Sequence, residues 1–406
     1  MYSPYSSRHF TTHIDPVSGT KIAVLSTHVA PVQKAFYFIN SSWSDDGRYM
    51  WFHCAFPPAG PARQCLAVID FLTDEIHRFP EASGLDLGGP LVDSKTGDVY
   101  LGLASGIYKR SPNPADKIVQ IAKMPKYLVD MGARTCGTHL TFTPDRQELL
   151  VDIQTSEGSV IGTFNIMTGE FSEWYRTQPE IPYNHGQLNP VDGNVCMCAH
   201  EFGWNPEEKE DCPPAFVDGI YPRLQIITRD GKRTMLKPYK NFGGHEFWAP
   251  DGKSIYYQNS AYRAFKSKKL YGSEVGTLLH DKLDGSDPEV ICEVDLPGGA
   301  GVWHAHCSKD QKYFVMDGAY ATGEFPLWRG CETCVHFFNK ETGKLFKFLT
   351  KNPVVEGWSL ENQCPYHIDP HPRFVLDDTM ITFTTTICGR VDAAVVSVDQ
   401  LIEATK

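Results

Sequence analysis

A unit of two strands joined by a tight turn recurs along this chain, and it restricts the possible folds more than any other feature. One copy is "HEFWAPDGKSIYY" (residues 245–257), in which a strand, an Asp-Gly turn and a second strand follow one another. Equivalent turns lie near Asp46, Lys95, Asp145, Asp192, Asp251, Asp310 and Asp377. Seven units, spaced by 47 to 67 residues, match the size of a four-stranded propeller blade with its loops.

The remaining segments fit the same architecture. Apolar and polar residues alternate with a period of two, each unit adds a further hairpin, and long amphipathic helical windows are scarce. A lone hairpin, "HFTTHIDPVSGTKIAVLS" (residues 9–26), precedes the first unit, whereas the last unit, ending near Leu401, lacks its outer strands. We therefore predict an all-β fold in which residues 1–406 form one seven-bladed β-propeller. Its blades are four-stranded and antiparallel, and the N-terminal strands close the ring.

Composition excludes several classes of protein. With 41% apolar residues the chain can bury a substantial core, and its net charge of −11 argues against binding to nucleic acid. No apolar run of about 18 residues is present, which predicts no membrane span. No secretory signal is visible at the start, and the 12 cysteines are too few for a disulfide scaffold and indicate reduced thiols. We expect a cytoplasmic protein, with an exported and processed form as the alternative.

Histidine recurs at one position of the repeated unit. Counted back from each turn, the equivalent positions are Asn40, Gly89, His139, His185, His245, His304 and His371. Five of the seven are histidine, although the chain has only 15 histidines in 406 residues. The innermost strands of a propeller line its central channel, so we expect five imidazoles around one mouth of that channel. The alternative is that the repeat favours histidine there for packing or capping.

Polar residues near the last inner strand suggest a metal site. Gln363 and His367 precede His371 in a proline-interrupted loop. Together with His304 they would supply imidazole and amide donors that suit a borderline divalent metal. His306 and Asp369 are competing ligands, because the spacing is loose.

Two further segments carry polar residues toward the same mouth. "CAHEFGWNPEE" places His200 at the end of an inner hairpin, and "YPRLQIITRDG" places Arg223, with Tyr221 beside it, at the start of the next strand. Arginine is suited to bidentate binding of a carboxylate. An ordinary exposed arginine at a sheet edge is the alternative.

These residue types favour proton abstraction next to a carboxylate. The chain contains no GxSxG motif and no phosphate-binding loop, and the mouth positions carry no carboxylates of the kind that hydrolyse glycosides. In a 4-linked uronic acid, a metal or arginine can stabilise the developing enediolate while a base removes the C5 proton and the 4-oxygen leaves. A neutral histidine is a suitable base.

The blade motifs resemble those of a known family. The segments "FYFINSSWSDDGRYMWF", "HGQLNPVDGNVCMCAHEFGW", "GGHEFWAPDG", "WHAHCSKD" and "HIDPHPRF" are similar to successive motifs of the oligogalacturonate lyases, which are seven-bladed propeller polysaccharide lyases. The resemblance covers nearly the whole chain and is strongest over residues 183–252 and 303–374. It implies a divalent metal held by three histidines and a glutamine, with manganese as the first candidate and calcium or zinc as alternatives.

Carried over by motif, the metal ligands are His304, Gln363, His371 and a third histidine. The family's compact Gln-x-x-His-x-His-Pro pattern is longer by three residues here. Either His367 loops into the site or Asp369 substitutes for the histidine.

The resemblance also implies catalytic roles. Arg223 corresponds to the family's catalytic arginine, His245 to its proposed base and His185 to a histidine at the mouth of the fourth blade. We add His139 as a further catalytic candidate from its place in the ring. The candidate substrate-binding residues are Asn40, Tyr221 and His200.

The expected activity is therefore metal-assisted β-elimination on an acidic oligosaccharide, by a monomer or homodimer. Ulvan lyases and enzymes that cleave rhamnosyl-glucuronic acid linkages also resemble this chain, so the uronic acid stays open. The alternatives are a glycoside hydrolase acting on a uronic acid glycan and a non-catalytic propeller that serves as a binding scaffold.

Overall fold

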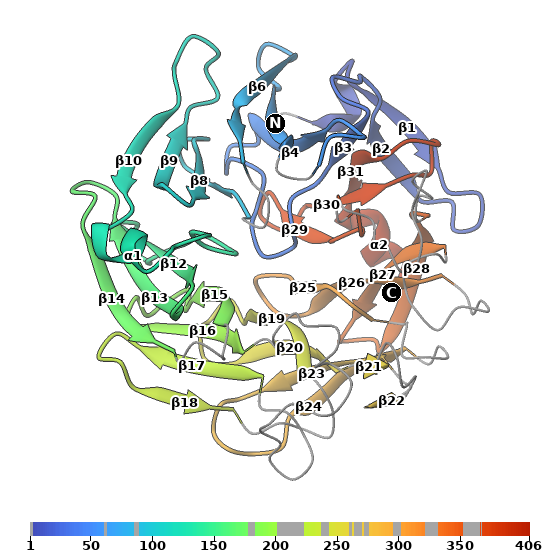
Figure 1. Ribbon diagram of the computed structural model, residues 1–406. Helices are drawn as coiled ribbons and strands as arrows, with labels where there is room; N and C mark the ends of the chain where they lie inside the picture. Colours follow the sequence, from blue (N-terminus) through green and yellow to red (C-terminus); the bar gives the residue numbers. More distant parts are fainter. Residues whose placement is uncertain are drawn as a thin grey trace.

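A computed structural model describes the chain except for short stretches. The described residues are 3–60, 63–84, 89–177, 183–200, 223–236, 243–259, 262–263, 270–271, 276–294, 302–320, 332–351, 366 and 368–406. Within them, seven antiparallel sheets surround a central axis (Figure 1), as the repeated units predict.

Each sheet is one blade, and its strands follow from the axis outward in chain order. Blade 1 comprises β3 (Val32–Lys34), β4 (Tyr49–Ala55), β5 (Cys65–Asp70) and β6 (Glu75–Ser83). Blade 2 comprises β7 (Leu91–Val92), β8 (Val99–Leu103), β9 (Gly106–Arg110) and β10 (Val119–Lys123). Blade 3 comprises β11 (Thr141–Phe142), β12 (Glu148–Thr155), β13 (Gly158–Asn165) and β14 (Phe171–Arg176). Blade 4 comprises β15 (Tyr183–Leu188), β16 (Val195–His200), β17 (Leu224–Thr228) and β18 (Arg233–Met235).

The remaining blades keep this order with two exceptions, a separate ribbon within the chain segment of blade 5 and two N-terminal strands on the outside of the closing blade. Blade 5 comprises β19 (Gly243–Trp248), β20 (Ile255–Asn259), β23 (Gly276–Asp281) and β24 (Glu289–Val294), and the separate ribbon β21 (Tyr262–Arg263) and β22 (Leu270–Tyr271) falls between β20 and β23 in the chain. Blade 6 comprises β25 (Ala305–Cys307), β26 (Tyr313–Ala319), β27 (Thr333–Asn339) and β28 (Lys344–Leu349). The closing blade comprises β29 (Arg373–Val375), β30 (Met380–Thr385), β31 (Asp392–Ser397), β2 (Lys21–Leu25) and β1 (Phe10–Ile14).

Helical structure is minor in the described residues. It consists of the 3-10 turn η1 (Pro4–Ser6) and the helices α1 (Lys126–Asp130) and α2 (Val398–Ala404). Neither helix has the length and apolar character needed to cross a bilayer.

The aspartates that recur at the inner turns hold those turns together. The Asp145 carboxylate accepts hydrogen bonds from the Thr143 hydroxyl (2.6 Å) and from the backbone N–H of Gln147 (3.0 Å). Asp310 binds the Ser308 hydroxyl at 2.6 Å in the same way. A short acidic side chain can bond the backbone two residues onward, and this property favours aspartate in tight turns.

The prediction that N-terminal strands close the ring is confirmed. β2 pairs with β31, with Ile22 opposite Val396 and Val24 opposite Ala394, and Figure 1 shows these two strands side by side. The closing blade has five strands rather than the predicted four, because β29 to β31 supply three and the N-terminal hairpin adds two.

We expect the closing blade to be sensitive to a cavity on β2. Ile22 is fully buried against β31 and α2, whereas Ile14 on β1 is 57% exposed. Ile22→Ala should lower the free energy of unfolding by about 2–5 kcal/mol, measured from urea titrations. Ile14→Ala is the matched control and should change it by less than about 0.5 kcal/mol. Equal effects of the two substitutions would contradict closure through β2.

Candidate active site at the histidine mouth

The structure brings the five repeated histidines to one mouth of the channel. His185 and His245 lie within β15 and β19, and the others lie one or two residues before β25, β29 and β11. The ring centroids of His245 and His304 are 4.1 Å apart, those of His304 and His371 are 4.2 Å apart, and those of His139 and His185 are 5.1 Å apart. The propeller symmetry therefore converts a sequence repeat into a cluster of imidazoles.

Tyr37 lies among these histidines, and sequence reasoning missed it. Its ring stacks on His139 at 4.9 Å and lies 4.7 Å from His371, 5.4 Å from His304 and 6.5 Å from His185, centroid to centroid. Burial, with Glu246 nearby, raises the pKa of the Tyr37 phenol well above its ordinary value, although Arg223 acts in the opposite direction. The hydroxyl therefore stays protonated at neutral pH.

The backbone adopts a left-handed conformation at three of the histidines. His185, His245 and His371 have φ of 54°, 52° and 47°, in the left-handed region that few residues other than glycine adopt. The pairing of β15 with β16 and of β19 with β20 shifts register at the first two. Such bulges redirect a side chain, so local strain helps to set where these imidazoles point.

Asp317 on β26 positions two of the histidines. Its Oδ1 accepts the backbone N–H of His304 at 2.8 Å, and its Oδ2 accepts the His304 ring at Nδ1 (3.0 Å) and the backbone N–H of His371 (2.8 Å). Burial, together with the charge of Asp369, raises the pKa of Asp317 to about 7, although these hydrogen bonds oppose the shift. With Nδ1 held by a carboxylate, His304 presents Nε2 as its lone-pair donor.

His304, Asp369 and His371 form a group that can hold a metal ion. One potential ligand atom from each lies within 4.8 Å of the others, and all three side chains are buried. A metal-binding imidazole commonly donates its second N–H to a carboxylate, as His304 does to Asp317. The geometry therefore brings Asp369, one of the competing ligands, to the site.

Of the three other candidate metal ligands, the structure describes His306 and not the remaining two. Gln363 and His367 lie outside the described residues, so their ligand roles stay predictions. His306, a competing ligand, packs against Phe247 and Phe374 with centroids 5.8 and 6.1 Å away. Burial lowers its pKa well below the ordinary value, and it takes no part in the three-residue group.

His245 is held in one tautomer next to this group. Its Nδ1 lies 3.1 Å from the backbone carbonyl of Trp303 and 3.0 Å from Oε1 of Gln258. A carbonyl only accepts, so Nδ1 carries the proton and Nε2 carries the lone pair. Burial, followed by the charges of His304 and Arg223, lowers the pKa of His245 to about 3. The imidazole is therefore neutral and can accept a proton.

Arg223 is paired with a buried carboxylate that sequence reasoning also missed. Its Nη1 donates to Oε2 of Glu246, and Nδ1 of His185 lies 3.4 Å from Oε1 of the same residue. Burial alone would raise the pKa of Glu246, but Arg223 and His185 hold it well below its usual range. Glu246 follows His245 directly, so one strand positions both the candidate base and the arginine.

The non-histidine positions of the ring have structural roles. Asn40 donates its amide to the backbone carbonyls of Pro90 (2.9 Å) and Gly89 (3.5 Å) and so links blades 1 and 2. A Cβ on Gly89 would lie 3.1 Å from Nδ1 of His139, so glycine leaves room for that ring. A role for Asn40 in substrate binding stays a prediction.

The last two predicted contacts lie near Arg223. The His200 ring stacks on Tyr183 at 5.2 Å, and its backbone N–H donates to the carbonyl of Arg223 at 2.7 Å. This places His200 at the edge of the mouth. Tyr221 lies outside the described residues.

Comparisons with known proteins find relatives that match most of the chain. The chain is 23% identical to the oligogalacturonate lyase of Dickeya dadantii (strain 3937) over 405 residues, which cover 94% of each chain. It is 21% identical to the oligogalacturonide lyase of Pectobacterium atrosepticum over 393 residues, again covering 94% of each. No protein-family model matches.

Solved structures give the same result for the fold. An oligogalacturonate lyase in complex with manganese superimposes with a TM-score of 0.70 at 16% identity, covering 96% of each chain. An oligogalacturonate lyase from Vibrio parahaemolyticus gives a TM-score of 0.69 at 16% identity, covering 98% of each. The predicted resemblance to oligogalacturonate lyases is confirmed, and the resemblance to ulvan and rhamnosyl-glucuronate lyases stays a prediction.

The buried pair between Arg223 and Glu246 should be costly to break. Glu246→Ala leaves a buried guanidinium without its carboxylate and should lower the free energy of unfolding by about 3–5 kcal/mol, measured by urea titration. Asp130→Ala removes one partner of the exposed Lys126 pair and should cost less than about 1 kcal/mol. A Glu246→Ala protein as stable as this control would show that the pair has no structural role.

Proposed function

We propose that this protein is a metal-dependent lyase that cleaves 4-linked uronic acid oligosaccharides by β-elimination, with oligogalacturonate as the first candidate substrate. The observation that carries the proposal is the placement of a neutral, tautomer-fixed His245 within 4.1 Å, ring to ring, of His304 in the group of candidate metal ligands. The full-length similarity to proteins named oligogalacturonate lyase supports the choice of reaction and sugar.

The residues present fit a divalent cation. Two imidazoles and one carboxylate form a donor set that suits borderline metals, and manganese is the first candidate because a structurally similar lyase is described in complex with it. Calcium and zinc are the alternatives, and Gln363 and His367 are candidates for further ligands. When bound, the cation would supply Lewis-acid stabilisation of the uronate carboxylate.

The protein's own residues divide the remaining work. Arg223 would bind the same substrate carboxylate, a task suited to a guanidinium, and this contact would make the C5 proton more acidic. Nε2 of His245 would remove that proton. A base whose pKa is near 3 is weak, so the reaction depends on this acidification rather than on base strength.

The leaving oxygen needs a proton donor, and Tyr37 is suited to this role. Its raised pKa keeps the phenol protonated, and its ring lies against His139, His185, His304 and His371. We assign to its hydroxyl the transfer of a proton to the 4-oxygen as the C4–O bond breaks. His139 and His185 line the same space and would contact the sugar.

Ultraviolet absorbance is the direct test of the reaction. Incubation with digalacturonate should produce rising absorbance from a new C4–C5 double bond, and a chelator should abolish the rise until manganese is restored. A rhamnosyl-glucuronate and an ulvan fragment complete the panel and identify the sugar. Release of a reducing sugar without absorbance would mean hydrolysis and would overturn elimination. Absence of both signals across the panel would contradict the proposed enzyme class.

Metal binding can be measured separately from turnover. By titration calorimetry, His304→Ala should abolish manganese binding, and His77→Ala, which alters a partly exposed histidine on β6, should leave it unchanged. Equal affinities of the two variants would place the metal elsewhere.

Removal of either the proposed base or the proposed acid should lower turnover. His245→Asn, which retains a residue tolerant of the left-handed backbone, should lower kcat at least 100-fold, within the range for general acid–base groups of about 10²–10⁴. Tyr37→Phe should do the same, because it removes only the hydroxyl. Tyr127→Phe on α1, with 42% of the residue exposed, is the control. A Tyr37→Phe enzyme with unchanged kcat would remove Tyr37 from the mechanism.

A further inference from the structure

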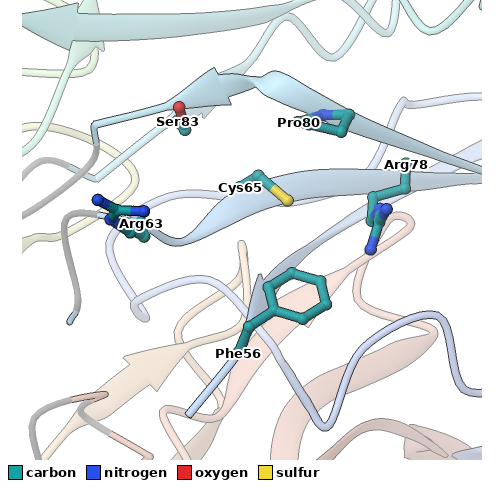
Figure 2. Close-up of a pocket in the computed structure, with 6 residues that line it drawn as sticks. All are labelled: Phe56, Arg63, Cys65, Arg78, Pro80 and Ser83. Carbon is teal, nitrogen blue, oxygen red and sulfur yellow. The ribbon is translucent and has the colours of Figure 1, made fainter. Parts of the chain in front are cut away.

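A surface pocket on blade 1 contains a pair of cysteines and two arginines that the proposed lyase reaction does not use. The pocket has a volume of about 460 Å³ and is lined by Phe56, Arg63, Cys65, Arg78, Pro80 and Ser83. Figure 2 shows Cys65 between Arg63 and Arg78, with Phe56 opposite. Phe56 follows β4, Arg63 precedes β5, which begins at Cys65, and the other three residues lie on β6.

Cys54 is the cross-strand neighbour of Cys65. The two residues are opposite one another in the antiparallel pairing of β4 and β5, and both are free thiols. Opposed residues of antiparallel strands have Cα atoms about 4.5–5.5 Å apart, within the range of about 4.4–6.8 Å that a disulfide accepts. A register shift between Cys65 and Leu66 in the pairing of β5 with β6 interrupts the ladder at this position.

The two thiols differ in their surroundings. Cys54 is fully buried and packs in the cluster between blade 1 and the closing blade, whereas Cys65 also faces the pocket. A hydrogen bond from Cys54, with a smaller contribution from Arg78, lowers the pKa of Cys65 although burial and Glu81 oppose the shift. The same interaction, followed by burial, raises the pKa of Cys54. Cys65 lines the pocket and Cys54 does not, so a reagent in the pocket meets Cys65 first, and Cys65 is the nucleophile of the pair.

Cys136 and Cys307, two other buried cysteines, have different surroundings. Burial raises the pKa of Cys136 and of Cys307 well above the ordinary thiol value, as expected for inert thiols in a core. Reactive cysteines lie instead in electropositive, partly accessible places, often beside a second thiol that resolves the first product. Cys65 is only 4% exposed, but it lines the pocket together with Arg63 and Arg78 and lies opposite the second thiol, Cys54.

The arginines indicate what kind of molecule the pocket accepts. The Arg78 guanidinium lies 5.1 Å from the centroid of Phe56, and its Nη1 donates to the carbonyl of Val29 at 3.4 Å, which fixes its position. Arg63 borders the same space. Two guanidinium groups beside an aromatic ring suit a small molecule that carries carboxylates.

We propose that Cys65 and Cys54 form a thiol–disulfide exchange site for small disulfides that carry carboxylates. The Cys65 thiolate attacks one sulfur of the bound disulfide, forming a mixed disulfide and releasing one thiolate. Cys54 then attacks Sγ of Cys65, loses its proton, and releases the second half of the reagent as a thiol. The protein loses two hydrogens, and the reagent is reduced to two thiols. The site is independent of the proposed lyase activity.

Mass spectrometry of the full chain tests this inference. The starting protein carries Cys388→Ser, because Cys388 is the exposed cysteine among the described residues. Treated with oxidised glutathione, it should lose two hydrogens, and peptide mapping should show Cys54 linked to Cys65. Adding Cys54→Ser should trap the mixed disulfide on Cys65, whereas adding Cys65→Ser should prevent both products at this site.

The charge of the reagent provides the control for the pocket. Cystamine is a small cationic disulfide, so it should react with Cys65 about tenfold or more slowly than oxidised glutathione at low ionic strength. Arg78→Gln should slow the anionic reagent and leave the cationic one unchanged or faster. Equal rates for the two reagents would overturn the role of the arginines. A Cys65 adduct that Cys54 never resolves would overturn the proposed pair.

Discussion

The pairing of β2 with β31 is the constraint on which the rest of the structure depends. Each blade is a sheet packed between two neighbours, and a ring of such sheets is stable only if the last blade joins the first. Here Ile22 and Val24 from the start of the chain lie opposite Val396 and Ala394 from its end. Once the ring is closed, equivalent positions of successive blades face one axis. The five histidines at these positions therefore lie close together.

Closure brings the imidazoles together, but buried carboxylates set their orientation. Asp317 on β26 binds the backbone N–H of His304 in its own blade and that of His371 in the next. Asp152 on β12 repeats this arrangement, accepting the N–H of Thr138 in its own blade and that of Gly186 in the next. Each aspartate fixes the starts of two adjacent inner strands. Buried aspartates therefore fix the positions of the residues at the mouth of the channel, and these aspartates need not contact a substrate.

The sequence predicts the architecture because the strands and turns of one blade are neighbours in the sequence. The alternation of period two and the aspartate given for six of the seven inner turns lie close together in the sequence, as in residues 245–257, and counting back from the turn identifies the histidines. The last unit lacks outer strands, and this predicts that the N-terminal hairpin completes its blade. The fifth strand of the closing sheet could not be anticipated, because strand number there depends on how much of both chain ends pairs.

The site was less predictable where its contacts cross between blades. Tyr37 lies outside the repeat, and nothing in its local sequence shows that it reaches four histidines. Asp317 and Glu246 do leave a trace, since each is a carboxylate within a buried strand, as in "KYFVMDG" and "HEFW". A buried acid needs a partner, and asking for that partner would have drawn attention to both. Asp369 lies two residues from His371, and His306 lies two residues from His304, so sequence spacing does not decide which of them is the better candidate metal ligand. The structure favours Asp369, because it lies in the group with both histidines.

The left-handed backbone at His245 has a consequence for how this scaffold can diverge. Glycine and asparagine adopt that conformation readily, so either could replace the histidine while leaving the strand and its bulge in place. Such a descendant would keep the arginine, the ligand group and the shape of the mouth, but would lack the imidazole that we propose as the base. It would be a sugar-binding protein, a lectin derived from an enzyme by one substitution.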